Sequence, residues 1–485
     1  MAPQGILPSF FTAGRIPLDI LSEIVVHWAL SDSDAPWKAS VVCHLWRSAV
    51  LSTPNAWSRV NICFPMLKKT RRRKIGTKNH NKEKDSEFES QSNAANADLE
   101  SAAESESESS AELEDDDDDE DPSQEKPRPL GLWLSRARQS DLFIRMKLGF
   151  SPRIDFVYPA IQDLVEHFPK IKELVLDDDS YLLSLNQLLD MFGPAPALEH
   201  LTLSIIKHRE ELGPTEELTI VKGFWNFLKQ TPRLRSLKLS KCLLGPMPPA
   251  TGPQLHLKLR SLSLDGAHLF GLHTVLKTIQ PFLCLEELAF TSSVPCLIRS
   301  NAGVHPITLP TLVTLAIDDD INILANFTVP KLRSLILDKY LSKDDKRSLP
   351  GLLSNLFERG TDLRSLTISF APITKDKFVQ IFQHIPLLEI LEFRDCSVDM
   401  QSLIHSTTSH HPLCPQLHTL RLYSSHLADG ASLLELVVVR KQSTHCRTIT
   451  TLRIGDCKYI DLWDVQRIRT AGGPYLDVEY NESQD

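Results

Sequence analysis

A short apolar motif that recurs along most of the chain is the feature that most constrains the fold. Four of its copies are "RLRSLKLS" (233–240), "KLRSLSLD" (258–265), "KLRSLILD" (331–338) and "DLRSLTIS" (362–369), and all fit L-x-x-L-x-L. Eleven apolar triplets share this frame, at a mean spacing of about 28 residues. Their middle residues are Leu174, Leu201, Leu237, Leu262, Leu288, Leu315, Leu335, Leu366, Leu391, Leu420 and Leu452. This self-similarity indicates an array of stacked structural repeats.

The spacing is typical of leucine-rich repeats. In each unit the two leucines of L-x-L point to one side of a short strand, and the residue between them points to the other. One unit cannot bury its apolar face alone, whereas stacked neighbours bury a continuous core. We therefore expect an α/β leucine-rich-repeat solenoid over residues 159–480. It should contain about eleven irregular repeats, with parallel strands on the concave face.

Helices are predicted between the strands, because apolar residues there recur at i, i+3 and i+4. The stretches are "LLSLNQLLDMFG", "VKGFWNFLKQ", "LHTVLKTIQPF", "LPGLLSNLFERG" and "KDKFVQIFQHI". The segment "INILANFTVP" (321–330) lies in the shortest gap and is predicted to form a 3₁₀ or extended turn. Cys242, Cys396 and Cys457 each follow their triplet by three residues, where leucine-rich repeats carry Asn or Cys. We expect these three thiols to be structural.

The residues between and after the leucines should line the concave face, which repeat arrays commonly use for binding. Acidic residues gather in the first and middle repeats and arginines in the last ones. Arg and Tyr are favoured anchors of protein interfaces. We therefore predict a substrate-binding patch formed by Arg394, Arg421, Tyr423 and Arg453. The alternative is that these are merely solvated strand positions.

Composition excludes several classes of function. No apolar run is long enough to span a membrane, and the N-terminus does not resemble a secretory signal. The nine cysteines are scattered and form no C-x-x-C pair, which favours reduced thiols in the cytoplasm and/or nucleus. The sequence contains no phosphate-binding loop, H-E-x-x-H or G-x-S-x-G motif. We expect no catalytic residue, no bound metal and no cofactor.

A segment of unusual charge interrupts the chain. Residues 66–129 contain few apolar residues, a basic stretch (68–84) and then an acidic one (98–121). Such a segment cannot bury enough surface to offset the cost of ordering, so we predict a disordered insertion. The basic block 68–74 is either a nuclear import signal or a solvated tether. Without both charged stretches the net charge of −9 moves close to neutral, which argues against nucleic acid and membrane surfaces as partners.

The residues before this insertion form a separate helical unit. "IPLDILSEIVVHWAL" has apolar residues at helical spacing, and a second helical stretch, "WKASVVCHLWRSAVLS", follows a polar break. In the second stretch Val41, Val42, Leu45, Trp46 and Val50 are expected to form one apolar stripe. About fifty residues make a poor core alone, so the unit at 15–64, which ends in a first strand, needs a neighbour or a partner.

The residues "IPLDILSEIV" and "VVCHLWRSAVLSTPNAW" resemble an F-box, in the form found at the start of fungal F-box proteins. Ile16-Pro17 stands where the family has Leu-Pro, and Asp19 replaces a frequent Glu. "GLWLSRARQSDLFIRMKL" (131–148) is also similar to the segment that comes after the F-box in these proteins, and we expect a connecting helix and strand at 130–158. A leucine-rich array after these segments matches the family's architecture.

The resemblance implies a substrate-recognition subunit of a Skp–cullin–F-box ubiquitin ligase. The module would dock a Skp-type adaptor, and through it a cullin, while the repeats hold a protein substrate. The adaptor-binding residues implied are Ile16, Pro17, Leu18, Ile20, Leu21, Ile24, Val42, Cys43, Leu45 and Trp46. Two alternatives remain. One is a scaffold whose N-terminal helices only cap the solenoid, and the other is an enzyme, which no sequence motif supports.

Overall fold

The fold is described from a computed structural model of the whole chain. It describes residues 16–63, 130–148, 161–178, 183–205, 220–221, 224–244, 258–266, 272–291, 306–318, 321–338, 349–357, 362–370, 372–373, 375–398, 400–407, 412–426 and 428–481. The chain divides into two units, 1–67 with 130–485, and 68–129. The predicted disordered insertion at 66–129 lies outside the described residues, as does its basic block.

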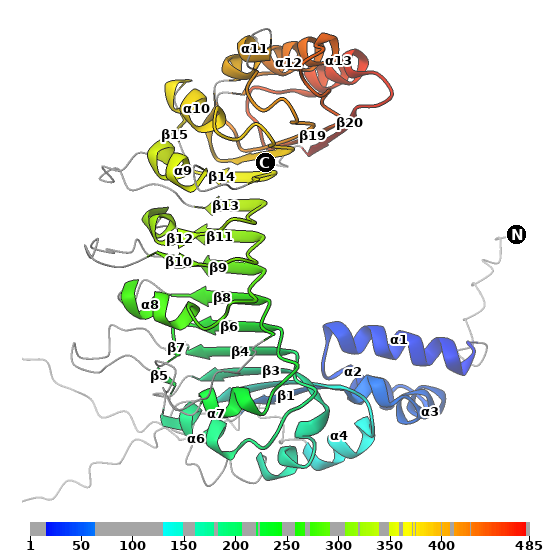
Figure 1. The fold of residues 1–485 in the computed structure, drawn as a ribbon. Coiled ribbons are helices and arrows are strands. Elements are labelled where there is room, and N and C mark those ends of the chain that lie inside the picture. Colours follow the sequence, from blue (N-terminus) through cyan, green and yellow to red (C-terminus); the bar gives the residue numbers. More distant parts are fainter. Residues whose placement is uncertain are drawn as a thin grey trace, which may run out of the picture. The chain divides into compact units, whose positions relative to one another are not determined.

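A sheet of 14 strands, parallel throughout, organises the described part of the chain (Figure 1). Its strands, in spatial order, are β1 (Arg59–Cys63), β2 (Leu142–Leu148), β3 (Ile171–Asp178), β4 (His200–Ile205), β6 (Ser236–Ser240), β8 (Ser261–Asp265), β9 (Glu287–Thr291), β11 (Thr314–Asp318), β13 (Ser334–Asp338), β14 (Ser365–Ser369), β16 (Ile390–Arg394), β18 (Thr419–Tyr423), β19 (Thr451–Gly455) and β20 (Asp477–Asn481). Strand order follows chain order, as it must when each repeat stacks on the one before it.

The eleven predicted leucines align in one row across this sheet. Leu174 pairs with Leu201 at one end, Leu366 with Leu391 near the middle, and Leu420 with Leu452 at the other end. All eleven are buried. The predicted α/β leucine-rich-repeat solenoid is therefore confirmed.

The sheet is longer than the eleven predicted repeats. Ile144 of β2 aligns with Leu174, Val60 of β1 aligns with Ile144, and Val478 of β20 aligns with Leu452. The strand that ends the N-terminal unit and the strand predicted at 130–158 are thus the first two strands of the same sheet. These strands carry Val60, Ile144 and Val478 where the frame has its middle leucine, which is why the repeat pattern alone did not include them.

Helices return the chain from one strand to the next and lie along one side of the sheet (Figure 1). The five predicted stretches form α6 (Leu183–Met191), α7 (Phe224–Lys229), α8 (Leu272–Ile279), α9 (Leu349–Phe357) and α10 (Lys375–Phe382). The short connection forms a 3₁₀ helix, η6 (Ile321–Asn326), as predicted. Three further helices follow, α11 (Gln401–Thr407), α12 (Gly430–Gln442) and α13 (Leu462–Gly472).

Three short strand pairs and two single-turn elements complete the repeats. The pairs are β5 (Ile220–Val221) with β7 (Leu243–Leu244), β10 (Ile307–Thr308) with β12 (Phe327–Thr328), and β15 (Pro372–Ile373) with β17 (Ser397–Val398). Between β2 and β3 lie a helical turn at 161–165 and the 3₁₀ helix η3 (Phe168–Lys170).

The three cysteines singled out by the repeat pattern join neighbouring repeats. Cys242 Sγ donates to the carbonyl oxygen of Leu203, and Cys396 Sγ donates to that of Ile368, at 3.6 and 3.2 Å. Cys457 Sγ makes the same bond to Leu422. In each case the acceptor is the last apolar residue of the preceding repeat's L-x-x-L-x-L motif. Burial raises the pKa of Cys242 to about 12 and also raises that of Cys457. All three thiols are buried and bonded to the neighbouring repeat, which is the structural role predicted for them.

A buried arginine closes the loop before β18. Arg440 of α12 has no exposed surface, and its guanidinium donates to the carbonyl oxygens of Leu413, Cys414 and Leu417 at 3.0–3.1 Å. Burial lowers its pKa. One side chain thus donates to three backbone carbonyls, of which that of Cys414 also accepts from the backbone N–H of Leu417.

The N-terminal module consists of α1 (Leu18–Ser31), α2 (Ala35–Ser40), α3 (His44–Ser52) and the 3₁₀ helix η2 (Pro54–Trp57). Three tryptophans join it to α4 (Leu130–Ala137), which follows the insertion. The rings of Trp37, Trp57 and Trp133 meet edge to face with centroids 5.1–5.9 Å apart. Trp133 Nε1 donates to the carbonyl oxygen of Trp57 at 2.7 Å, and Arg136 lies over two of the rings. The module thereby shares one apolar core with the first repeats.

We expect Leu366→Ala to lower the free energy of unfolding by about 2–5 kcal/mol, because it opens a cavity in the aligned leucine row. Leu283→Ala is the matched control, since Leu283 is 59% exposed and should change stability by less than about 0.5 kcal/mol. Urea unfolding followed by circular dichroism measures both. Equal shifts for the two variants would contradict a continuous packed core.

Candidate partner-binding surfaces

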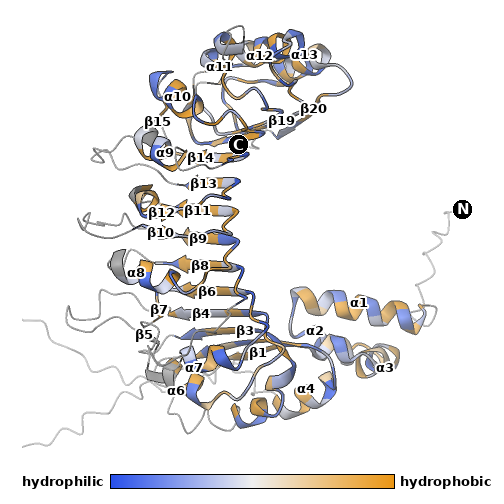
Figure 2. Cartoon of the chain, in the orientation of Figure 1, coloured by the Kyte–Doolittle hydropathy of each residue, from blue (hydrophilic) through white to orange (hydrophobic). Residues whose placement is uncertain are grey.

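Helix α1 has one apolar face inside the module and another on its surface. Leu21, Val25 and Ala29 are buried, at i, i+4 and i+8. Ile20 and Ile24 lie along one flank of this stripe and are 44% and 41% exposed. A helix with a single core-facing stripe would carry polar residues there. Figure 2 shows hydrophobic residues (orange) on more than one side of α1.

The second helical stretch is broken by a turn that exposes two valines. Helix α2 ends at Ser40 and α3 begins at His44, so Val41 and Val42 lie between helices and are 75% and 59% exposed. The predicted stripe through Val41, Val42 and Val50 is therefore wrong, because only Val50 of the three points into the core. The turn breaks the 3.6-residue period on which that prediction relied.

Most of the implied adaptor-binding residues lie on the module surface. Those exposed are Ile16, Pro17, Leu18, Ile20, Ile24, Val42 and Cys43. Leu45 and Trp46 are half-buried. Leu21 is completely buried, so it holds the module together and offers no surface to a partner. Val41, which was not among the implied residues, joins the surface. We define the apolar module surface as Ile16, Leu18, Ile20, Ile24, Val41 and Val42.

The predicted substrate-binding residues lie together on three adjacent strands. Arg394 of β16 pairs in register with Tyr423 of β18, and its guanidinium lies 6.0 Å from the Tyr423 ring centroid. Arg421 of β18 pairs in register with Arg453 of β19. The four residues come from three repeats and lie in one patch, as the spacing of the leucine motif predicted. Whether this patch binds a substrate stays a prediction.

The three arginines of this patch already form ion pairs with carboxylates of the chain. Glu392 contacts both Arg394 and Arg421, the second at 3.1 Å, and its side chain is only 5% exposed. Arg453 pairs with Asp477 and Glu479 at 3.1 and 2.7 Å. The repeat pattern did not indicate the neutralisation of Arg453, because Asp477 and Glu479 belong to β20, a strand without the leucine frame. The patch is therefore an ionic network with little net charge.

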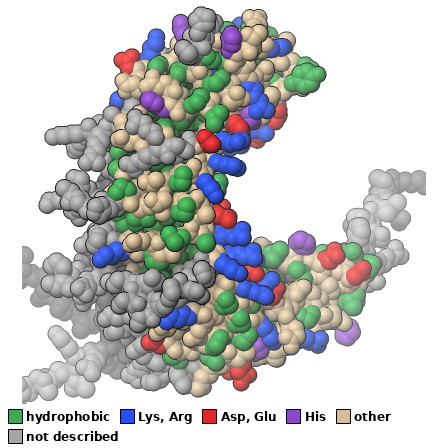
Figure 3. Space-filling model, viewed as in Figure 1, with side chains coloured by type: hydrophobic (Ala, Val, Ile, Leu, Met, Phe, Trp, Pro, Cys, Tyr) green, Lys and Arg blue, Asp and Glu red, His purple; other side chains and the backbone are tan. Residues whose placement is uncertain are grey.

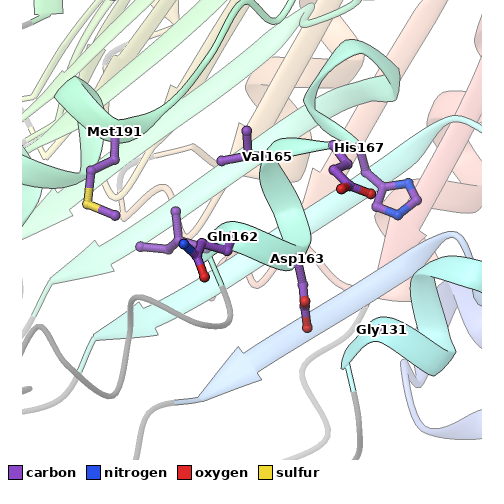
Figure 4. A pocket seen from close by; sticks show the side chains of 8 residues that line it. Gly131, Gln162, Asp163, Val165, His167 and Met191 are labelled. Atoms are coloured by element: carbon purple, nitrogen blue, oxygen red, sulfur yellow. The ribbon is translucent and has the colours of Figure 1, made fainter.

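A third feature is a pocket of about 800 Å³ beside the helical turn at 161–165 (Figure 4). Asp163, Glu166 and His167 line it together with Gly131 and Met191. Burial and the neighbouring Lys170 lower the pKa of His167. Among the described residues no group of three His, Cys, Asp or Glu side chains could hold a metal ion, and this pocket is no exception.

Comparisons with known proteins give distant matches to solved structures. No family model and no curated protein matches the chain. The Rad7–Elc1 complex of yeast gives 16% identity over 68% of this chain and 77% of that chain, with a TM-score of 0.36. The leucine-rich repeat-containing protein LegL7 from Legionella pneumophila gives 15% identity over 68% of this chain and 98% of that chain, with a TM-score of 0.35. The fold assignment rests on the sheet and its register.

In the described part of the chain, no helix combines the length and the hydropathy that a membrane span requires.

We expect Glu392→Gln to destabilise the protein by about 1–3 kcal/mol, because two guanidiniums lose their nearly buried counter-charge. The figure is set below that of a fully buried pair, since both arginines are about half exposed. Glu286→Gln is the control: Glu286 is 46% exposed and lies 3.5 Å from Arg260, so its loss should cost less than about 0.5 kcal/mol. Thermal unfolding measures both variants. Equal melting temperatures for Glu392→Gln and Glu286→Gln would contradict a stabilising role of the network.

Proposed function

We propose that the chain is the substrate-recognition subunit of a Skp–cullin–F-box ubiquitin ligase. In this proposal the N-terminal module docks a Skp-type adaptor, the adaptor connects it to a cullin, and the solenoid holds a protein substrate. The chain itself carries out no catalysis and acts in the cytoplasm and/or nucleus. Its contribution is proximity, which raises the effective concentration of substrate lysines near the ubiquitin-loaded enzyme.

The observation that carries the proposal is the apolar module surface. Ile20, Ile24 and Val42 are each more than 40% exposed, while other residues already supply the core of the module. Scattered single apolar residues on a surface need no explanation, but six within 27 residues of one small module indicate a covered surface. The resemblance to an F-box places its adaptor contacts at five of these six positions.

The alternative is a scaffold whose N-terminal helices only cap the solenoid. Capping requires contacts to the first repeats, and Trp57, Val60 and Trp133 make them without any residue of the apolar module surface. The cap alone therefore leaves Ile24 and Val42 unexplained, which favours the adaptor proposal.

We expect the full-length chain to co-elute with a Skp-type adaptor on size exclusion, and Ile24→Asp with Val42→Asp to weaken this complex at least about 30-fold. That factor corresponds to about 2 kcal/mol, the loss expected when two interface anchors become charged. Both side chains are exposed in the free protein, so the double variant should keep the wild-type circular dichroism spectrum and melting temperature.

Leu283→Asp is the matched control, because Leu283 is an exposed leucine on the solenoid and its change adds the same type of charge outside the module. This variant should bind the adaptor as the wild type does. Absence of any complex with wild-type chain would favour the scaffold. Leu21→Asp is unsuitable as a test, since a charge at a fully buried position unfolds the module itself.

A further inference from the structure

A row of mostly charged residues follows the edge of the sheet where the strands begin. In this row the backbone N–H of each residue donates to the carbonyl oxygen of its neighbour on the preceding strand, as Arg260 does to Arg235 and Arg364 does to Arg333, both at 2.8 Å. We define the amino-edge row as Lys172, Glu199, Arg235, Arg260, Glu286, Val313, Arg333, Arg364, Glu389 and His418. Successive members are about 4.8 Å apart, the spacing of neighbouring strands.

Two pairs of arginines stand side by side in this row. Arg235 lies next to Arg260, and Arg333 lies next to Arg364. In each pair one arginine has a carboxylate partner: Arg260 contacts Glu286 at 3.5 Å, and Arg364 contacts Glu389 at 3.0 Å. No carboxylate among the described residues pairs with Arg235 or Arg333, and both are exposed.

Additional basic residues reinforce each pair. The motif "[KR]LRSL" places Arg233, Lys258 and Lys331 two residues before an arginine of the row, and all three are exposed; before Arg364 the same position is taken by an exposed aspartate, Asp362. Figure 3 shows Lys and Arg side chains (blue) gathered along the side of the sheet where the strands start, with acidic ones (red) between some of them. Like charges on adjacent strands repel one another, and an anion between two guanidiniums relieves that repulsion.

The distance between the two arginine pairs indicates which kind of polyanion could contact both. Their centres are four strand spacings apart, or about 19 Å. An extended polypeptide covers that distance in about six residues. Glu199, Glu286 and Glu389 interrupt the row, and they would repel the evenly charged backbone of a nucleic acid. A polypeptide can instead place its acids opposite the arginines and neutral residues opposite the glutamates.

We propose that the amino-edge row binds an acidic segment of a partner protein, with two carboxylate clusters about six residues apart, one on each arginine pair. The inference deepens the proposed function, on which it rests only for the identification of that partner as the substrate. Direct binding requires no adaptor. The patch around Arg421 and Arg453 suits an acidic partner less well, because carboxylates of the chain already occupy its arginines.

The test is fluorescence anisotropy with full-length chain and a labelled peptide, Asp-Asp-Gly-Ser-Gly-Ser-Asp-Asp, at about 50 mM salt, where exposed charges are weakly screened. We expect Arg235→Glu with Arg333→Glu to weaken binding at least 10-fold. Lys375→Glu with Lys377→Glu makes the same change of net charge on α10, at two exposed residues outside the row, and should weaken binding less than 2-fold. A peptide with its four aspartates contiguous should bind more weakly than the spaced one.

Three results would overturn the inference. These are no binding of the spaced peptide by the wild type, equal loss in the two double variants, and stronger row-dependent binding of a single-stranded RNA of equal length. The row variant is also tested for co-elution with the Skp-type adaptor, which should be unchanged. Loss of peptide binding with an intact adaptor complex supports the row, whereas a wild-type chain that binds the peptide but no adaptor counts only against the proposed function.

Discussion

The parallel register of the leucines is the constraint on which the rest of the sheet depends. Each middle leucine lies beside the next, as Leu366 does beside Leu391, and a slip of one residue would turn the leucines to solvent. Because this register is fixed by the core, it also fixes which polar residues become neighbours. Glu392 lies beside Arg421 and Arg333 lies beside Arg364 only because the leucines next to them are aligned. Packing inside the solenoid therefore determines the charge pattern outside it.

The tryptophan cluster has a comparable role for the N-terminal module. Trp57 comes before the insertion and Trp133 after it, and their contact brings two segments that are 76 residues apart into one core. The module thus gains the neighbour that fifty residues need for stability. Since this contact uses none of the residues of the apolar module surface, stability does not explain why that surface is apolar. The proposed docking of an adaptor accounts for it, and in that proposal stability and binding depend on different side chains of the module.

Much of the solenoid could be predicted from the sequence, because a leucine frame repeated eleven times averages out local ambiguity. The helices between strands followed from periodicity, and the short 321–330 segment was correctly predicted to be too short for a full helix. The candidate sites were harder. Leu21 and Ile24 are three residues apart and both apolar, and only the packed structure shows that the first is buried and the second exposed. Likewise, Glu479 lies outside the leucine frame, so its contact with Arg453 required the register of β20.

The two proposed surfaces differ in the forces that act on them. Burial of Ile24 and Val42 against a partner depends on apolar area and is insensitive to moderate salt. Attraction at Arg235 and Arg333 acts between exposed charges and is screened over about 8 Å at physiological ionic strength. A partner on the first surface is accordingly held by contact area and a partner on the second by charge, which favours fast association and fast exchange. The proposed function, in which the adaptor is retained and each substrate is released, is consistent with this division.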